Sequence, residues 1–317
     1  MRLFKTKIKS TGFVFLGPIL GAFVEQDEKS FQKESRLQQM VVLSAGVFAN
    51  LVACLAFFLI LILFFQAFYS PAGYVFDNYA FDEVNTEDIV SFTETRNNKT
   101  IISTKDFNYT YFGDINSFTN NTKNSNGTAV LYFDSPAIRH ELDRIIIAID
   151  GQKVKTREDI SFYLSQKKPG DAIIVETLSD ENQITKKTLI LGENPADKDK
   201  PFLGVMNYGV QKKGLFSQII NFVGSFKNKN TYYSPKYNSI LTVYFYDLLW
   251  WIVMINLFVA MFNMLPLGIL DGGRFFYLAV WSITKNEKIA KKSFKIATRI
   301  ILMIFLLMII FWLISLF

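Results

Sequence analysis

The residues best suited to chemistry run from Asn263 to Gly273, in the order Asn-Met-Leu-Pro-Leu-Gly-Ile-Leu-Asp-Gly-Gly. They lie in an apolar region that a Lys-rich run follows. An ionised carboxylate at the centre of a membrane helix costs about 2.5 to 3.5 kcal/mol, so Asp271 needs compensation. Either Pro266 ends one helix and Asp271 caps the next, or Asp271 binds a metal ion within the bilayer. The spacing alone leaves both interpretations open.

The pattern Asn-x-x-Pro-x-x-x-x-Asp-Gly resembles the second signature of the site-2 protease family, the intramembrane zinc metalloproteases. The resemblance implies that Asp271 is a zinc ligand and that Pro266, Gly272 and Gly273 maintain the shape of the motif. In that family the other two protein ligands are the histidines of a His-Glu-x-x-His helix, whose glutamate is the general base. This sequence has a single histidine, His140, and no His-Glu-x-x-His. The 317 residues therefore cannot complete the family's zinc site alone.

The first ten residues contain the basic segment Arg-Leu-Phe-Lys-Thr-Lys-Ile-Lys-Ser. In the site-2 protease family a similar segment comes shortly after the His-Glu-x-x-His helix. We therefore expect a chain truncated before that helix, which reading the DNA upstream of the Met1 codon would test. The missing histidines equally suit a second hypothesis, a catalytically inactive pseudoprotease or a membrane binding protein.

A second motif lies in the first long apolar run, at Gly46 and Asn50. The two residues are four apart and so share one face of a helix. Ordinary helix packing explains them, with a small residue for close approach and an amide for a hydrogen bond between helices. The Gly-x-x-x-Asn pattern also resembles the family's motif on the helix after the catalytic one. That resemblance implies that Asn50, together with Asn263, positions the substrate.

Composition points to a membrane protein, because half of the residues are hydrophobic and 32 are Phe. Two apolar runs, 40–68 and 240–265, are long enough to span a bilayer, and 296–317 forms a third. The shorter run 11–24 contains Gly17 and Pro18 and fits a re-entrant hairpin, although an interfacial turn fits equally well. The net charge of +6 is too diffuse to indicate nucleic acid. The single cysteine excludes an intrachain disulfide.

The region between the first two spans divides into two parts. Residues 69–128 are polar and Asn-rich, with sequons at Asn98, Asn108, Asn120 and Asn126, which favours the non-cytoplasmic side. Residues 129–208 alternate β-branched runs with turns at Asp150-Gly151 and Pro169-Gly170-Asp171. Ser135-Pro136-Ala137 and the two turns resemble a PDZ domain of the protease-associated type. That resemblance implies a groove able to take a peptide ligand.

The expected fold is a multi-pass α-helical membrane protein, with three full spans, a re-entrant apolar hairpin and an inserted α+β PDZ-like domain. The Lys-rich loop 285–295 is expected in the cytoplasm and 69–239 outside it. The expected partners are the lipid bilayer, a transmembrane peptide substrate and a peptide ligand of the PDZ-like domain, with Zn²⁺ as cofactor. The expected divisions are 1–39 for the basic segment and hairpin, 40–68 for the first span, 69–128 for the Asn-rich loop, 129–208 for the PDZ-like domain, 209–239 for an interfacial linker, 240–284 for the second span with its motif, and 285–317 for the basic loop and last span.

Overall fold

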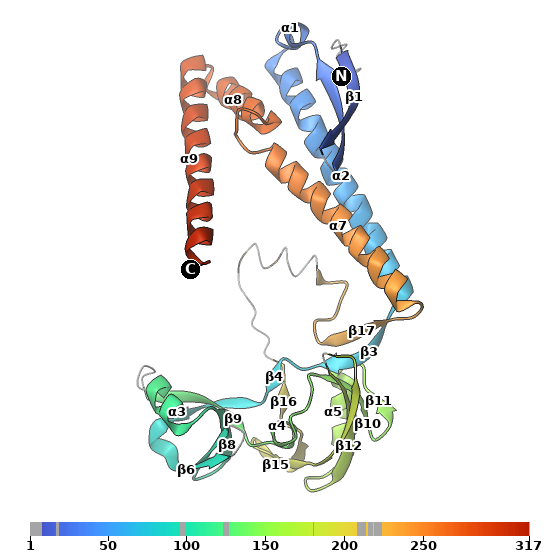
Figure 1. Ribbon diagram of the computed structural model, residues 1–317, viewed down its shortest axis with the longest axis vertical. Helices are drawn as coiled ribbons and strands as arrows, with labels where there is room; N and C mark the ends of the chain where they lie inside the picture. Colours follow the sequence, from blue (N-terminus) through green and yellow to red (C-terminus); the bar gives the residue numbers. More distant parts are fainter. Residues whose placement is uncertain are drawn as a thin grey trace. The chain divides into compact units, whose positions relative to one another are not determined.

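The computed structural model describes the chain in two compact units (Figure 1). The first comprises residues 1–67 and 240–317, and the second comprises residues 68–239. The described residues are 8–16, 19–95, 99–122, 127–179, 181–207, 214, 218 and 224–316. Most of the basic N-terminal segment and most of the stretch 209–223 within the expected interfacial linker lie outside them.

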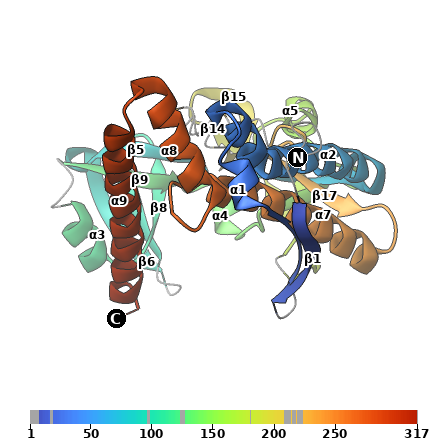
Figure 2. The same cartoon turned by 90° about the horizontal axis from the view of Figure 1, so that it is seen from above.

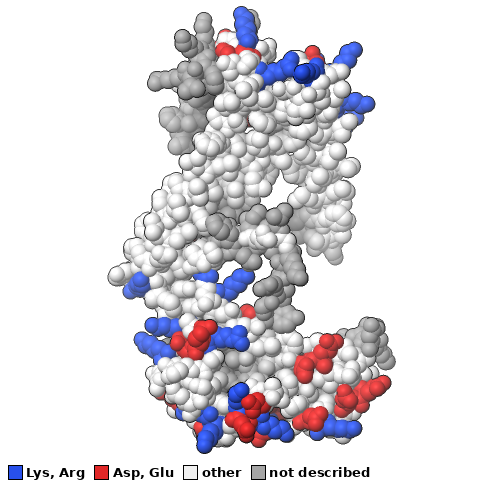
Figure 3. All heavy atoms as spheres, turned by 180° about the vertical axis from the view of Figure 1, so that it is seen from behind, with Lys and Arg blue, Asp and Glu red and all other residues white. Residues whose placement is uncertain are grey.

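The first unit holds three helices that are long and apolar enough to cross a membrane, namely α2, α7 and α9. They confirm the three predicted spans, with shifted ends. Figure 3 shows their surface as nearly free of charged side chains, with Lys and Arg gathered at the end where α9 begins. The elements of this unit are β1 (Ile8–Leu16), β2 (Ile19–Gln26), α1 (Glu28–Phe31), α2 (Arg36–Phe68), α7 (Ser239–Asn263), α8 (Asp271–Thr284) and α9 (Glu287–Ile314).

The predicted hairpin has antiparallel backbone pairing between β1 and β2, in a register that matches Leu16 with Ile19. The turn residues Gly17 and Pro18 fall outside the described part of the chain. The pairing agrees with the expected hairpin, while its re-entry into the bilayer stays a prediction.

The Lys-rich segment differs from the expected loop, because α9 already begins at Glu287. Asn286 caps the helix by accepting hydrogen bonds from the backbone N–H groups of Lys288 and Ile289. Lys291 then pairs with Glu287 one turn earlier, at 2.7 Å. Lysine is a good helix former, so a basic run that follows a capping residue extends the last span rather than preceding it.

The second unit contains two larger antiparallel sheets. One has the strand order β13-β12-β10-β3-β17, with β11 paired to β10, and the other has the order β5-β9-β8-β7-β6. Its helices are α3 (Ile115–Thr122), α4 (Pro136–Arg139) and α5 (Arg157–Ser165), with a 3-10 turn at Thr86–Asp88. Its strands are β3 (Tyr69–Val75), β4 (Asn78–Tyr79), β5 (Phe81–Asn85), β6 (Ile89–Thr95), β7 (Lys99–Thr104), β8 (Asn108–Phe112), β9 (Thr128–Phe133), β10 (Ile145–Ile149), β11 (Gln152–Lys153), β12 (Ala172–Leu178), β13 (Ile184–Ile190), β14 (Gly192–Asn194), β15 (Asp197–Phe202), β16 (Val205–Met206) and β17 (Thr231–Pro235).

The interval expected as an Asn-rich loop is largely folded, since it supplies most of the second sheet. Ile102, Tyr109 and Leu131 are buried in a core of their own, against which Phe118 of α3 packs. Some of the polar residues that suggested a loop are themselves buried, as Thr100 of β7 and Thr110 of β8 are. The sheet that contains β10 extends beyond residues 129–208, because β3 and β17 complete it.

The turn predicted at Asp150-Gly151 is confirmed. Asp150 and Gly151 both have positive φ angles, 50° and 77°, and join β10 to β11 as the two-residue hairpin that Asp-Gly favours. Thr156 caps α5 through two reciprocal hydrogen bonds. Its hydroxyl oxygen accepts from the Asp159 N–H, and the Asp159 carboxylate accepts from the Thr156 N–H. The likeness of this sheet to a PDZ domain stays a prediction.

Candidate functional site

The loop between α7 and α8 holds the motif that the sequence singled out. Helix α7 ends at Asn263, and a last turn forms where the Leu265 N–H donates to the Phe262 carbonyl oxygen at 3.0 Å. Pro266 has no N–H to continue the helical ladder, so the helix stops there. The Leu270 N–H then donates to the Leu267 carbonyl oxygen at 3.0 Å, which turns the chain into α8.

The glycines of the motif allow two backbone segments to touch. A Cβ atom added to Gly272 would overlap the carbonyl group of Met264, and one added to Gly273 would overlap the Leu267 carbonyl oxygen. Both glycines are buried and helical, so the close approach, rather than an unusual backbone angle, is what requires glycine. The start of α8 is therefore packed directly onto the loop that follows α7.

Helix α9 closes the same loop from another direction. The Thr298 hydroxyl donates a hydrogen bond to the Pro266 carbonyl oxygen at 2.8 Å. The Pro266 carbonyl follows the end of α7 and has no helical donor, and the hydroxyl satisfies it. Thr298 lies in the last apolar span, and no motif in the sequence identifies it.

Asp271 is the first helical residue of α8 and has an exposed side chain. Leu270, not Asp271, occupies the capping position, so the interpretation in which Asp271 caps α8 is off by one residue. A carboxylate in the first helical turn is stabilised by the positive end of the helix dipole. The Asp271 side chain therefore extends from the junction of α8 with the loop after α7.

The residues present do not by themselves fit a complete zinc site. Structural and catalytic zinc sites in proteins take at least three protein ligands. Within the described ranges, no three His, Cys, Asp or Glu side chains come together. His140, the sole histidine, is exposed after α4 in the second unit. Asp271 is thus a candidate ligand without its partners.

The other predicted site residues lie on two helices. Asn263 is the last residue of α7 and is half-buried, and Asn50 is half-buried in the middle of α2. Gly46 is exposed, with open space where a Cβ would stand. Among the described residues, no hydrogen bond or ion pair joins Asp271 to either asparagine. The structure therefore supplies their positions in the helices but no direct connection between them.

Helix α8 is held by aromatic and basic residues that the sequence did not single out. Figures 1 and 2 both show α8 between α1 and α9. Leu278 of α8 is buried with Phe31 of α1 and Leu43 of α2. The Arg36 guanidinium lies 3.9 Å from the centre of the Trp281 ring, a cation–π distance. The signals available in the sequence were Arg36, a basic residue at the start of the first span, and the aromatic residues Tyr277 and Trp281 shortly before the Lys-rich segment.

The family assignment rests on a match over nearly the whole chain. The model for peptidase family M50 matches residues 1–309. A comparison with curated proteins finds no matching sequence. The matched range includes the hairpin, α2, α7, the loop between α7 and α8, and α9 up to residue 309. The chain therefore belongs to peptidase family M50, the site-2 protease family of membrane metallopeptidases.

Proposed function

We propose that this chain is part of a membrane-embedded zinc metalloendopeptidase that cleaves transmembrane or signal-peptide-like segments. The observation that supports this most is the position of Asp271. It begins a helix packed, through Gly272 and Gly273, onto the loop that Asn263 and Pro266 open. Such a loop keeps a single carboxylate at a defined point between apolar helices.

In this proposal Asp271 supplies one metal ligand, and Asn50 and Asn263 position the substrate strand. Zinc in such an enzyme lowers the pKa of its bound water to about 7 and polarises a carbonyl. The two histidine ligands of the family are not both available in these 317 residues, because His140 is the only histidine among them. The peptide substrate has to unwind, because a helix hides its amides from any protease.

The second candidate function is a pseudoprotease or membrane binding protein that uses its PDZ-like domain. The single histidine favours it directly. A cleavage assay separates the two candidates, using protein purified from its native membrane and a fluorogenic peptide derived from a transmembrane segment. The protease proposal predicts cleavage that a zinc chelator abolishes and that Asp271→Asn removes. Absence of cleavage in the native preparation, with peptide binding retained, would instead support the pseudoprotease.

We extend the proposal to membrane orientation. The Lys-rich segment 285–295 is placed in the cytoplasm because cytoplasmic ends of spans are enriched in lysine. Residues 69–239 are then outside it, since a single candidate span, α7, separates them from that segment. The sequon at Asn108, whose side chain is exposed at the start of β8, agrees with that side.

A further inference from the structure

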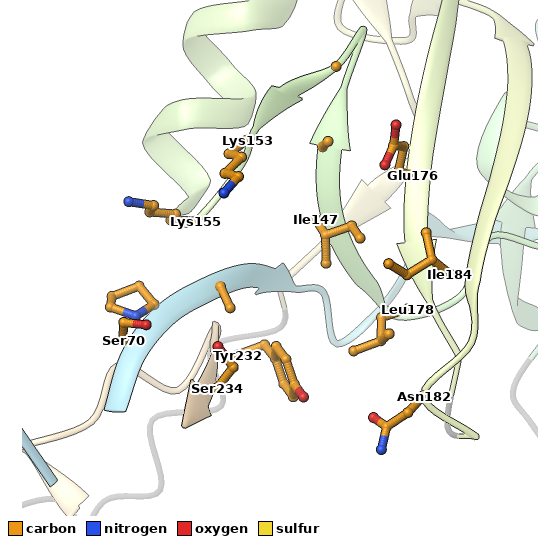
Figure 4. A pocket seen from close by; sticks show the side chains of 14 residues that line it. Ser70, Ile147, Lys153, Lys155, Glu176, Leu178, Asn182, Ile184, Tyr232 and Ser234 are labelled. Carbon is orange, nitrogen blue, oxygen red and sulfur yellow. The ribbon is translucent and has the colours of Figure 1, made fainter. Parts of the chain in front are cut away.

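A pocket of about 680 Å³ lies on the outer face of the sheet that contains β10 and β3. Strand β3 pairs with β10 only through Tyr74 and Val75. Beyond Gly73 the two strands separate, while β10 pairs with β11 instead. The pocket occupies the space that this separation opens, and β17 extends its wall. Figure 4 shows the lining side chains.

The pocket is cationic on one side and apolar on the other. Lys153 and Lys155 lie together on one side, and Ile147, Leu178 and Ile184 come from the strands opposite (Figure 4). Both lysines are exposed, and neither forms an ion pair with a described residue. The pocket therefore offers two free ammonium groups above an apolar floor.

The one carboxylate of the lining is already neutralised. Glu176 of β12 pairs with the Lys186 amine at 2.7 Å. Its charge is therefore balanced within the sheet by a lysine outside the lining. An anion entering the pocket would meet attraction from Lys153 and Lys155.

The pocket walls continue directly into two candidate spans. Ser70 of the lining follows Phe68, the last residue of α2, by two residues, which limits their separation to about 8 Å. Ser234, on β17, precedes α7 by only a few residues. The Lys236 N–H donates to the Phe68 carbonyl oxygen at 2.8 Å, so the two connections are tied together.

The side chains next to this hydrogen bond are of the kind that gathers at a membrane surface. The Phe68 and Tyr237 rings meet edge to face at 5.8 Å, and Tyr237 is strongly exposed. Aromatic side chains of this kind gather at headgroup depth. The headgroup layer is about 5 to 8 Å thick on each side of the hydrocarbon core, comparable to the reach from Phe68 to Ser70.

We propose that this pocket binds the headgroup of an anionic phospholipid. Lys153 and Lys155 would pair with the phosphate, and the apolar floor formed by Ile147, Leu178 and Ile184 would contact the glycerol and upper acyl carbons. Each lysine near an anionic membrane surface contributes about fivefold in affinity. The inference rests on the pocket and its covalent link to the spans, and not on peptide cleavage.

The test uses the full chain in nanodiscs and a phosphatidylglycerol with a photoreactive headgroup. Crosslinked peptides are mapped by mass spectrometry, which localises the lipid despite other basic surfaces. We expect labelling within residues 147–184, falling about 25-fold in the Lys153→Gln, Lys155→Gln double variant. The matched control, Lys105→Gln with Lys198→Gln, removes two exposed lysines of the same unit outside the pocket and should label like the natural protein.

Two further samples identify the ligand. A photoreactive phosphatidylcholine should leave the pocket unlabelled, and excess inorganic phosphate should not displace phosphatidylglycerol. Displacement by phosphate would make the site one for a free anion and overturn the proposal. Equal labelling of the pocket variant and the control variant would also overturn it, because the lysines would then have no role.

Discussion

The Thr298 hydroxyl on α9 donates its hydrogen bond to the Pro266 carbonyl oxygen, across 32 residues of sequence and 2.8 Å of space. This bond connects the last apolar helix to the loop that presents Asp271. The loop is thereby fixed by three elements: the end of α7, the start of α8 and the side of α9. Substitutions at these contacts should move Asp271 without touching its carboxylate.

Replacing Thr298 with valine keeps the side-chain shape and removes the donor. Hydrogen bonds between helices in membranes are worth about 0.6 to 1.7 kcal/mol, so we expect a loss of stability in that range. Thermal unfolding of the detergent-solubilised chain measures it. Thr298→Ser, which retains the hydroxyl, serves as the control and should lose less. Equal losses in the two variants would assign the effect to packing rather than to the bond.

The Gly272→Ala variant tests the close approach of α8 to its loop. The added methyl group would overlap the Met264 carbonyl group, and overpacking of this kind costs about 1 to 3 kcal/mol. Gly46→Ala is the matched control, because open space surrounds that position and alanine favours a helix by about 1 kcal/mol. We expect a lower unfolding temperature for Gly272→Ala and no decrease for Gly46→Ala. A Gly272→Ala chain as stable as the natural one would contradict the packing described.

How far the sequence predicted the fold depended on whether a signal was local. The spans were found because α2, α7 and α9 are apolar over their own length, and the turn at Asp150-Gly151 because that pair favours a two-residue hairpin. The pairing of β3 with β17 joins Tyr74 to Thr231, and no local pattern could reveal a partner so distant in sequence. The sheet within the Asn-rich interval was missed because its strands are rich in polar residues, some of them buried, such as Thr100 and Thr110.

For the candidate site too, the sequence predicted what has a local signal and missed what depends on contacts between distant residues. The spacing from Asn263 to Asp271 identified the loop, but why Gly272 and Gly273 must be glycine emerged only when the Met264 and Leu267 carbonyl groups were seen against them. Thr298 could not be selected from a span with several equivalent positions. The capping position was wrong by one residue because Leu270 adopts the extended backbone that Asp271 was expected to adopt.

Acid should loosen the hairpin at Asp150. The Lys167 amine at 2.7 Å, and then the Ile174 N–H at 2.8 Å, hold the pKa of the Asp150 carboxyl below its ordinary value of about 3.9. The unfolded chain therefore binds this proton more readily than the folded one. The contribution to stability is complete above about pH 5 and is lost as the pH falls through the lowered pKa.

Hydrogen exchange of the amides in β10 and β11 measures this effect between pH 7 and pH 3, after correction for intrinsic rates. We expect protection to fall at the acid end in the natural chain. The Asp150→Asn variant should start with lower protection and change less with pH. A variant that shows the same pH dependence as the natural chain would assign the acid effect to other groups.

Membrane orientation can be tested with single cysteines. Cys54 is first replaced with alanine, because it is the only natural thiol. Cysteine is then introduced at Lys198 of β15 or at Lys292 of α9, both exposed. A maleimide that cannot cross membranes should label position 198 in intact cells and position 292 only after lysis. Labelling of position 292 in intact cells would reverse the proposed orientation.

The central claim is that Asp271 binds zinc in the natural protein, and metal analysis tests it most directly. The protein is purified from its native membrane as the natural chain, as Asp271→Asn and as Asp247→Asn, which removes another exposed acid of the same unit. We predict one zinc ion per chain in the natural and Asp247→Asn proteins and a large loss in Asp271→Asn. Equal zinc in all three, or zinc in none, would contradict the account.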